Sequence, residues 1–81
     1  MEVQVYSRDD CPFCVKAKDF FRKKNILFQE FKVGTDITRE EYASLTEMKT
    51  VPAIYIDGKL IGGFTDLVDY AVDNPEVFDG N

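Results

Sequence analysis

The chain contains no histidine and only two cysteines among its 81 residues. A structural zinc site needs four ligands, so these two thiols cannot build one alone, and we expect no metal cofactor. No apolar run approaches the roughly 18 residues that a membrane-spanning helix needs, and we expect no membrane contact. The first seven residues, MEVQVYS, lack a basic segment followed by an apolar stretch. We therefore expect no secretion signal and a cytoplasmic protein, in a compartment that keeps thiols reduced.

Positive charge is also scarce in this sequence. Ten lysines and arginines stand against fifteen aspartates and glutamates, which gives a net charge of −5 at pH 7. A surface that binds nucleic acid needs clustered basic residues, so nucleic acid is not an expected partner. The remaining composition, 44% hydrophobic and 31% charged, is typical of folded proteins. A chain of this length forms one hydrophobic core, and we expect a single domain over residues 1–81 and a monomer.

The hydrophobic pattern predicts an alternation of strands and helices. Alternating or β-branched segments predict strands at 3–6, 26–33, 53–56 and 59–61. Helical spacing and capping signals predict helices over Pro12–Lys24, from Thr38 to about Met48, and over about 65–72. The tail at 73–81, DNPEVFDGN, is expected to fray. The resulting order, β-α-β-α-β-β-α, predicts an α/β fold with a parallel unit followed by a hairpin.

Both cysteines lie where the first strand meets the first helix. Cys11 and Cys14 are separated by Pro12 and Phe13, and a C-x-x-C at this place is typical of thioredoxin-like redox proteins. The unpaired N–H groups and the dipole of a helix N-terminus stabilise an anion, so a thiol placed there ionises more readily. We therefore expect Cys11, at the helix start, to be the attacking thiolate. Cys14, one turn further in, is expected to be shielded and to act as the resolving thiol.

A structural disulfide and a pair of inert buried thiols are two other interpretations of the cysteine pair. A structural disulfide would close a loop of about four residues and would contribute only about 2 kcal/mol in the chain-entropy model. Two buried thiols that act as small hydrophobic side chains would explain neither Pro12 nor the position at a helix start. Both interpretations account for the pattern less well than redox chemistry.

Three motifs together resemble those of dithiol glutaredoxins over essentially the whole chain. They are Cys11-Pro12-Phe13-Cys14, Thr50-Val51-Pro52 and Gly62-Gly63-Phe64-Thr65-Asp66. The resemblance implies a thioredoxin-like fold, in which a four-stranded mixed sheet is flanked by three helices. It also implies an oxidoreductase that uses glutathione to reduce glutathione mixed disulfides and protein disulfides. Ribonucleotide reductase is a partner expected from the family.

The resemblance further implies a glutathione site. Its expected residues are Arg8, Phe13, Lys49, Thr50, Val51, Pro52, Gly63, Thr65 and Asp66. Arg8 and Lys49 would hold the glycyl carboxylate, and the backbone of Val51 would pair with the cysteinyl unit. Thr65 and the N–H groups around it would bind the γ-glutamyl carboxylate, while the side chain of Asp66 would bind the ammonium group.

Two backbone features of this site are expected as well. The sequence leaves the Val51–Pro52 peptide bond open between cis and trans, whereas the resemblance implies the cis form. A cis bond would turn the backbone of Val51 outward, where it could pair with an extended peptide. Gly62 and Gly63 would let a ligand approach the main chain closely.

The chain also departs from the usual family pattern. Phe13, the expected apolar wall beside the sulfur, stands where tyrosine is commoner, and Phe64 replaces a cysteine that many relatives carry. Asp9 and Asp10 are unusual negative neighbours, which we expect to raise the pKa of Cys11 somewhat.

Two alternative functions stay open on the sequence. The first is an iron–sulfur carrier with a cluster held between two copies by cysteine and glutathione, although Pro12 would crowd that approach. The second is a redoxin that is reduced by thioredoxin reductase without glutathione. Arg8, Lys49 and Asp66 argue against the second alternative, because such a protein needs no glutathione site.

Overall fold

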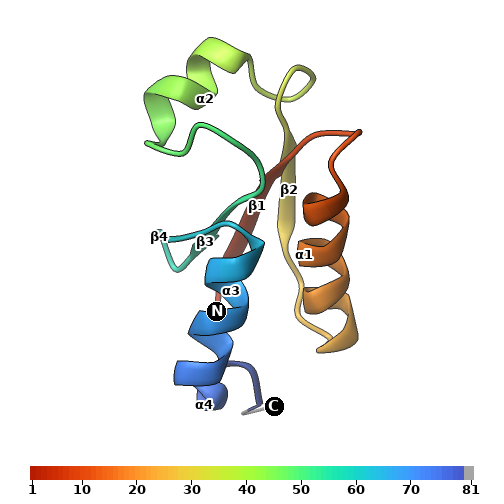
Figure 1. Cartoon of the computed structure of the whole chain (residues 1–81), viewed down its shortest axis with the longest axis vertical. Coiled ribbons are helices and arrows are strands. Elements are labelled where there is room, and N and C mark those ends of the chain that lie inside the picture. Colours follow the sequence, from red (N-terminus) through yellow and green to blue (C-terminus); the bar gives the residue numbers. More distant parts are fainter. Residues whose placement is uncertain (80–81) are drawn as a thin grey trace.

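The computed structural model describes residues 1–79, which form a four-stranded mixed sheet covered by helices (Figure 1). The elements are β1 (Val3–Ser7), α1 (Pro12–Lys23), β2 (Gln29–Lys32), α2 (Arg39–Leu45), β3 (Ala53–Ile56), β4 (Lys59–Gly62), α3 (Phe64–Asp73) and α4 (Pro75–Asp79). The strand order is β2-β1-β3-β4, in which β1 runs parallel to β2 and antiparallel to β3, and β3 and β4 form a hairpin. The predicted fold class is confirmed.

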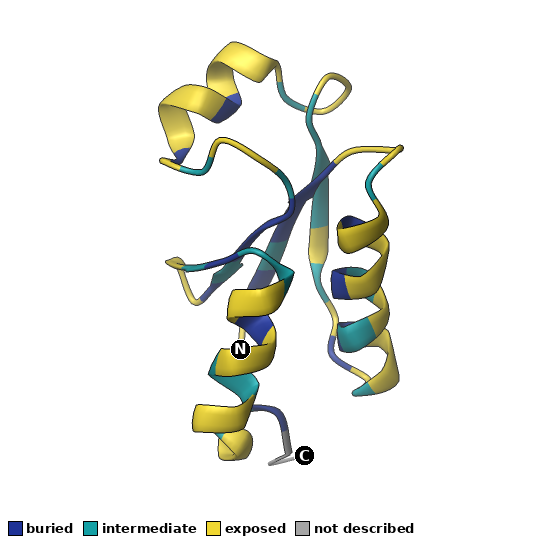
Figure 2. Cartoon of the chain, viewed as in Figure 1, coloured by how far each residue is buried: buried dark blue, intermediate teal, exposed yellow. Residues whose placement is uncertain are grey.

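The alternating strand residues divide the core between the two faces of the sheet. Val3 and Val5 of β1 pack with Phe21 of α1 and Leu67 of α3 in the larger cluster. Tyr6, on the opposite side of the same strand, packs with Tyr42 of α2 and Ala53 of β3 in a smaller cluster. Successive strand residues point to opposite faces, so α1 and α3 cover one face and α2 covers the other. Figure 2 shows α1 and α3 with exposed outer surfaces and buried inner ones.

Two predicted elements are shorter in the structure than in the sequence-based prediction. The predicted strand 26–33 forms only over Gln29–Lys32. Ile26 donates its N–H to the Phe21 carbonyl at the end of α1, and Val33 forms an isolated bridge with Ile37. The predicted helix through Met48 ends at Leu45. Thr46 there has an extended backbone, and its hydroxyl accepts the N–H of Met48 at 3.2 Å, which competes with continued helix.

The start of α2 agrees with its sequence signal. Glu41 N–H donates to the Thr38 hydroxyl at 3.0 Å, and Thr38 N–H donates to the Glu41 carboxylate at 2.9 Å. These reciprocal bonds form a capping box, and the helix begins where its capping signal predicts. The backbone hydrogen bond from Thr38 to the Glu41 carboxylate, with a contribution from the Thr38 side chain, holds the pKa of Glu41 below its usual value, since it favours the charged form. The first turn of α2 therefore places Arg39 at a defined position.

The prediction that the tail at 73–81 frays is wrong for its described part. Asp73 ends α3, and Pro75–Asp79 forms α4, a fourth helix beside the three predicted. Phe78 is only 4% exposed, and its ring lies 5.5 Å from the ring of Phe20 and 6.0 Å from that of Tyr70. The tail is held by burial of an aromatic side chain between α1 and α3. Gly80 and Asn81 lie outside the described residues.

Phe78→Ala is expected to lower the free energy of unfolding by about 3–5 kcal/mol, the usual cost of removing a buried phenylalanine. Urea denaturation followed by circular dichroism measures this change. Val72→Ala, at a position that is 73% exposed, is the matched control and should change stability by no more than about 0.5 kcal/mol. A loss below about 1 kcal/mol in Phe78→Ala would mean that the tail frays after all.

Candidate active site

The two cysteines form a disulfide at the N-terminus of α1. Cys11 is the N-cap residue, its sulfur accepts the N–H of Cys14 at 3.1 Å, and Pro12 occupies the first helical position. Cys14 is fully buried, whereas Cys11 is partly exposed. The expected difference in shielding is therefore confirmed, and an incoming disulfide can reach Cys11 more easily than Cys14.

The charges around Cys11 are more balanced than the sequence suggests. Asp9 pairs with Lys32 at 2.9 Å, and this hydrogen bond lowers the pKa of the Asp9 carboxyl. Asp10 lies 3.9 Å from Arg8. No acidic residue lies in the first turn of α1, within Pro12–Lys23. Nearby cations thus offset part of the repulsion that both aspartates would exert on a Cys11 thiolate.

The Thr50–Pro52 segment lies directly against the cysteine pair. The Val51–Pro52 bond is cis, as the family resemblance implies. The carbonyl oxygen of Val51 lies 3.7 Å from the sulfur of Cys11. Among residues 1–79, the N–H of Val51 donates to no other group. This segment therefore presents a free backbone donor beside the reactive sulfur, as a strand edge would.

A buried tyrosine of α2 forms a hydrogen bond with the Thr50–Pro52 segment. Tyr42 is 6% exposed, and its hydroxyl donates to the Thr50 carbonyl at 2.8 Å. Burial, with smaller contributions from Tyr55 and Tyr6, raises the pKa of Tyr42 to about 12. Its ring also packs at 5.8 Å from that of Tyr6. The bond ties α2 to the backbone that faces Cys11.

Tyr42→Phe is expected to remove about 1 kcal/mol of stability at pH 8, the usual contribution of such a hydrogen bond. The folded protein keeps Tyr42 neutral up to about pH 12, whereas the unfolded chain ionises it near pH 10. Stability from the neutral hydroxyl is therefore complete below pH 10 and is lost as the pH rises toward 12. The variant should lose less stability across that range in urea titrations. Equal losses in both proteins would show that Tyr42 ionises normally.

A pocket of about 240 Å³ lies beside the cysteine pair, between the Thr50–Pro52 segment and α3. We call it the α3-side pocket. Its lining residues are Phe13, Met48, Thr50, Val51, Pro52, Gly63, Phe64, Thr65 and Asp66. All residues predicted for glutathione except Arg8 and Lys49 are thus brought together here. The rings of Phe13 and Phe64 lie 6.4 Å apart and form an apolar wall.

The two glycines before α3 take part in the capping of that helix. Gly63 is the N-cap residue, and its N–H donates to the Asp66 carboxylate at 2.9 Å. Gly62 has a φ of +126°, and a Cβ there would collide with that carboxylate. The pair therefore lets Asp66 fold back over the helix start, where it contributes negative charge to the pocket.

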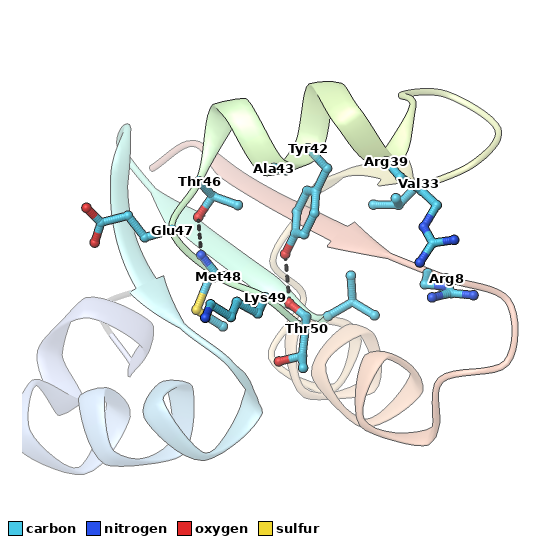
Figure 3. A pocket seen from close by; sticks show the side chains of 11 residues that line it. Arg8, Val33, Arg39, Tyr42, Ala43, Thr46, Glu47, Met48, Lys49 and Thr50 are labelled. Carbon is cyan, nitrogen blue, oxygen red and sulfur yellow. Dashed lines mark hydrogen bonds between the residues drawn. The ribbon is translucent and has the colours of Figure 1, made fainter.

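A second pocket of about 460 Å³ adjoins the first and shares Met48, Thr50 and Val51 with it. We call it the basic pocket. Its lining residues are Arg8, Val33, Arg39, Tyr42, Ala43, Thr46, Glu47, Met48, Lys49, Thr50 and Val51. Figure 3 shows the guanidinium groups of Arg8 and Arg39 at one end. Lys49 points away from them, toward Met48.

Arg39 is a candidate residue that the sequence analysis missed. It stands at the first position of α2, where a basic residue resembles any solvated cation. A positive charge at a helix N-terminus opposes the helix dipole, which is a weak signal that the position serves another purpose. Only folding brings it to the same pocket as Arg8, which follows β1.

These features define the chemical class of the protein. A dithiol at a helix N-terminus can reduce a substrate disulfide in two exchange steps and become oxidised itself. The oxidised pair is the state seen in the structure. The protein is a thiol–disulfide oxidoreductase of the thioredoxin-like fold.

Comparisons with known proteins place the chain more narrowly. The glutaredoxin family model matches residues 3–61. Glutaredoxin 3 of Escherichia coli K12 is 40% identical over 72 residues, which cover 88% of this chain and 84% of that protein. The hybrid peroxiredoxin hyPrx5 of Haemophilus influenzae is 37% identical over 68 residues, which cover 84% of this chain but only 28% of that protein.

A solved structure agrees with this similarity. The crystal structure of a buckwheat glutaredoxin–glutathione complex superposes with a TM-score of 0.79 at 25% identity, covering 93% of this chain and 72% of that one. The chain belongs to the glutaredoxin family.

Residues 1–79 contain no cluster of three or more histidine, cysteine, aspartate or glutamate side chains arranged to hold a metal ion. None of the helices within the same residues has the length and apolar character needed to cross a membrane.

Proposed function

We propose that this protein reduces glutathione mixed disulfides and protein disulfides with glutathione as the electron donor. One observation carries the proposal: the α3-side pocket and the basic pocket meet at Val51, next to the sulfur of Cys11. The cysteine of glutathione lies between two charged ends. One end carries a carboxylate and an ammonium group, and the other carries a second carboxylate. A site for this ligand needs a reactive sulfur at its centre and a polar pocket on each side of that sulfur.

The charges of the two pockets suit those ends. The N-terminus of α3 offers N–H groups to the γ-glutamyl carboxylate, and the Asp66 carboxylate can accept the neighbouring ammonium. Arg8 and Arg39 can bind the glycyl carboxylate at the far end, with Lys49 adding positive charge to the same pocket. The free N–H of Val51 can donate to the cysteinyl carbonyl between them. Relatives support the assignment, since the buckwheat protein forms a complex with glutathione.

The reaction on a glutathione mixed disulfide needs one protein thiol. The Cys11 thiolate attacks the glutathione sulfur, a Cys11–glutathione disulfide forms, and the other thiol leaves as a thiolate that takes a proton from water. The thiolate of a second glutathione then attacks the bound glutathione sulfur. Glutathione disulfide leaves, and the Cys11 thiolate is restored.

The reaction on a protein disulfide uses both thiols. Cys11 attacks one substrate sulfur and releases the other as a thiolate. Cys14 then loses its proton and attacks the sulfur of Cys11, which releases the second substrate thiolate and leaves the Cys11–Cys14 disulfide. Two glutathiones return the two electrons and leave as glutathione disulfide.

The Cys11 thiol is expected to have a depressed pKa, because its sulfur accepts the Cys14 N–H at the start of α1. Iodoacetamide alkylation of the reduced protein, followed against pH with peptide mapping, measures this value. Cys11 should react well below pH 8.5, the region where an ordinary thiol ionises, and ahead of Cys14. A midpoint for Cys11 near 8.5, or earlier labelling of Cys14, would refute the assignment.

Glutathione binding can be tested apart from turnover. Cys14→Ser is converted to a mixed disulfide with glutathione, and a second sample is converted to one with 2-mercaptoethanol, which has no peptide arms. Amide shifts that appear only with glutathione should involve Val51, Gly63 and Asp66, together with Arg8 and Arg39. If both adducts shift the same amides, the tripeptide does not occupy the two pockets.

A further inference from the structure

The basic pocket is larger than a glycyl carboxylate requires. A carboxylate takes roughly the volume of two water molecules, about 60 Å³, whereas the pocket holds about 460 Å³. Val33, Tyr42 and Met48 line it, so part of its wall is apolar. Arg8 and Arg39 stand at one end (Figure 3). A pocket with an apolar wall and paired guanidinium groups suits a side chain that has a methylene stem and a carboxylate head.

We propose that the basic pocket selects protein disulfides in which an acidic residue lies within two positions after the attacked cysteine. This inference rests on the proposed function, and it names the substrate class for the two-thiol reaction. In glutathione the only carboxylate after the cysteine is the glycyl terminus. An internal protein segment has no such terminus, and only an aspartate or glutamate side chain supplies the same charge there.

The geometry gives the direction of the segment. The γ-glutamyl unit, which precedes cysteine in glutathione, is assigned to the α3-side pocket, so residues that follow cysteine run toward the basic pocket. A substrate segment paired with Val51 keeps the same direction. Its following residues therefore come within reach of Arg8 and Arg39.

The negative charge of α3, on the other side of Cys11, adds to the preference for acidic residues after the substrate cysteine. The chain from Leu60 onward contains no lysine or arginine, and Asp66, Asp69 and Asp73 all lie on α3. In glutathione the ammonium group offsets the charge of Asp66, but a glutamate placed before the substrate cysteine has no such group and would meet this negative field. A glutamate placed after the cysteine meets the guanidinium groups instead. The basic pocket therefore attracts acidic residues that follow the substrate cysteine, and the α3 side repels acidic residues that precede it.

The test uses two disulfide-linked peptide dimers of identical composition. Each peptide has one cysteine and two glutamates, placed directly after the cysteine in one peptide and directly before it in the other. Both ends are blocked by acetylation and amidation, so that only the glutamates carry charge. Because each dimer is symmetric, attack on either sulfur gives the same mixed disulfide. The measured quantity is the rate constant for release of peptide thiol by the fully reduced protein, without glutathione.

The peptide with following glutamates should react at least about fivefold faster at low salt. The difference between the two rate constants should become smaller at a salt concentration on the order of 0.5 M, because salt screens the interaction between exposed charges. Equal rates for the two peptides, or no measurable reduction of either, would overturn the inference. Neither result would affect the reduction of glutathione mixed disulfides, so failure of this inference is distinct from failure of the proposed function.

A charge-reversal variant tests the pocket itself. Arg39→Glu should lose the preference and should react faster with a third peptide that carries two lysines after the cysteine. Glutamate is favourable at the N-terminus of α2, so the variant is expected to fold. Lys59→Glu, at an exposed position of β4 and outside both pockets, changes the net charge equally and should keep the original preference. A preference that survives in Arg39→Glu would exclude the basic pocket as its source.

Discussion

Cys14→Ser is expected to keep most of its activity on small glutathione mixed disulfides and to lose most of its activity on protein disulfides. The first reaction needs one protein thiol, because a second glutathione supplies the resolving sulfur. The second reaction depends on Cys14, which lies one turn from Cys11 and can reach its sulfur directly. Without Cys14, the mixed disulfide between Cys11 and the substrate persists until glutathione attacks it. During that time the released substrate thiolate can attack the mixed disulfide and form the substrate disulfide again.

Cys11→Ser should lose both activities, by about 100-fold or more. Cys14 is fully buried and lies inside the first turn rather than at the cap, so it lacks both access and the position of Cys11. An ordinary thiol with a pKa near 8.5 is only about 3% ionised at pH 7, which lowers its rate further. The expected loss is therefore the largest for any single substitution in the protein.

Both variants are assayed on both substrates at one ratio of reduced to oxidised glutathione. Val15→Ser, at an exposed position of the same helix turn, is the matched control and should retain both activities. If Cys14→Ser is equally inactive on both substrates, the one-thiol route and the glutathione site are both wrong.

Combined charge reversal at Arg8 and Arg39 is expected to raise KM for a glutathione mixed disulfide by about 100-fold, with a smaller effect on kcat. Each substitution replaces an attraction for the glycyl carboxylate with a repulsion, which we estimate at about 1.4 kcal/mol for each position. Asp10, which lies 3.9 Å from Arg8, would lose that partner and add to the repulsion. The reacting sulfurs lie away from this end of the ligand, so binding changes more than chemistry.

The control is Lys23→Glu combined with Lys59→Glu, which makes the same change in net charge outside both pockets. Added salt should narrow the gap between the Arg8 and Arg39 variant and its parent. An unchanged KM in that variant would remove the basic pocket from glutathione binding, and an equal rise in the control would assign the effect to net charge alone.

The parts of the fold that depend on local pattern could be predicted from the sequence. Alternation in β1, Pro12 at the start of α1 and the Thr38–Glu41 capping box each act over a few residues. The errors arose where long-range or competing contacts decide. Phe78 is held by rings from α1 and α3, and the hydroxyl of Thr46 ends α2 early.

The candidate site shows the same division. Cys11 and Cys14 can be predicted because their spacing and their place before a helix indicate redox chemistry. Arg39 was not found, because a single basic residue has no local signature and its role depends on the approach of Arg8 in space. The cis state of Val51–Pro52 was open for a similar reason, since the local preference between isomers is only about 0.5–1 kcal/mol.

The central claim, that glutathione reduces this protein during turnover, is tested most directly by two coupled assays on one small glutathione mixed disulfide. The first supplies NADPH, glutathione reductase and glutathione, and the second supplies NADPH and thioredoxin reductase without glutathione. Turnover in the first assay should occur and should rise with glutathione concentration, and little or none is expected in the second assay. Turnover that requires only thioredoxin reductase and does not depend on glutathione would contradict this claim. The protein would then be a redoxin that thioredoxin reductase reduces.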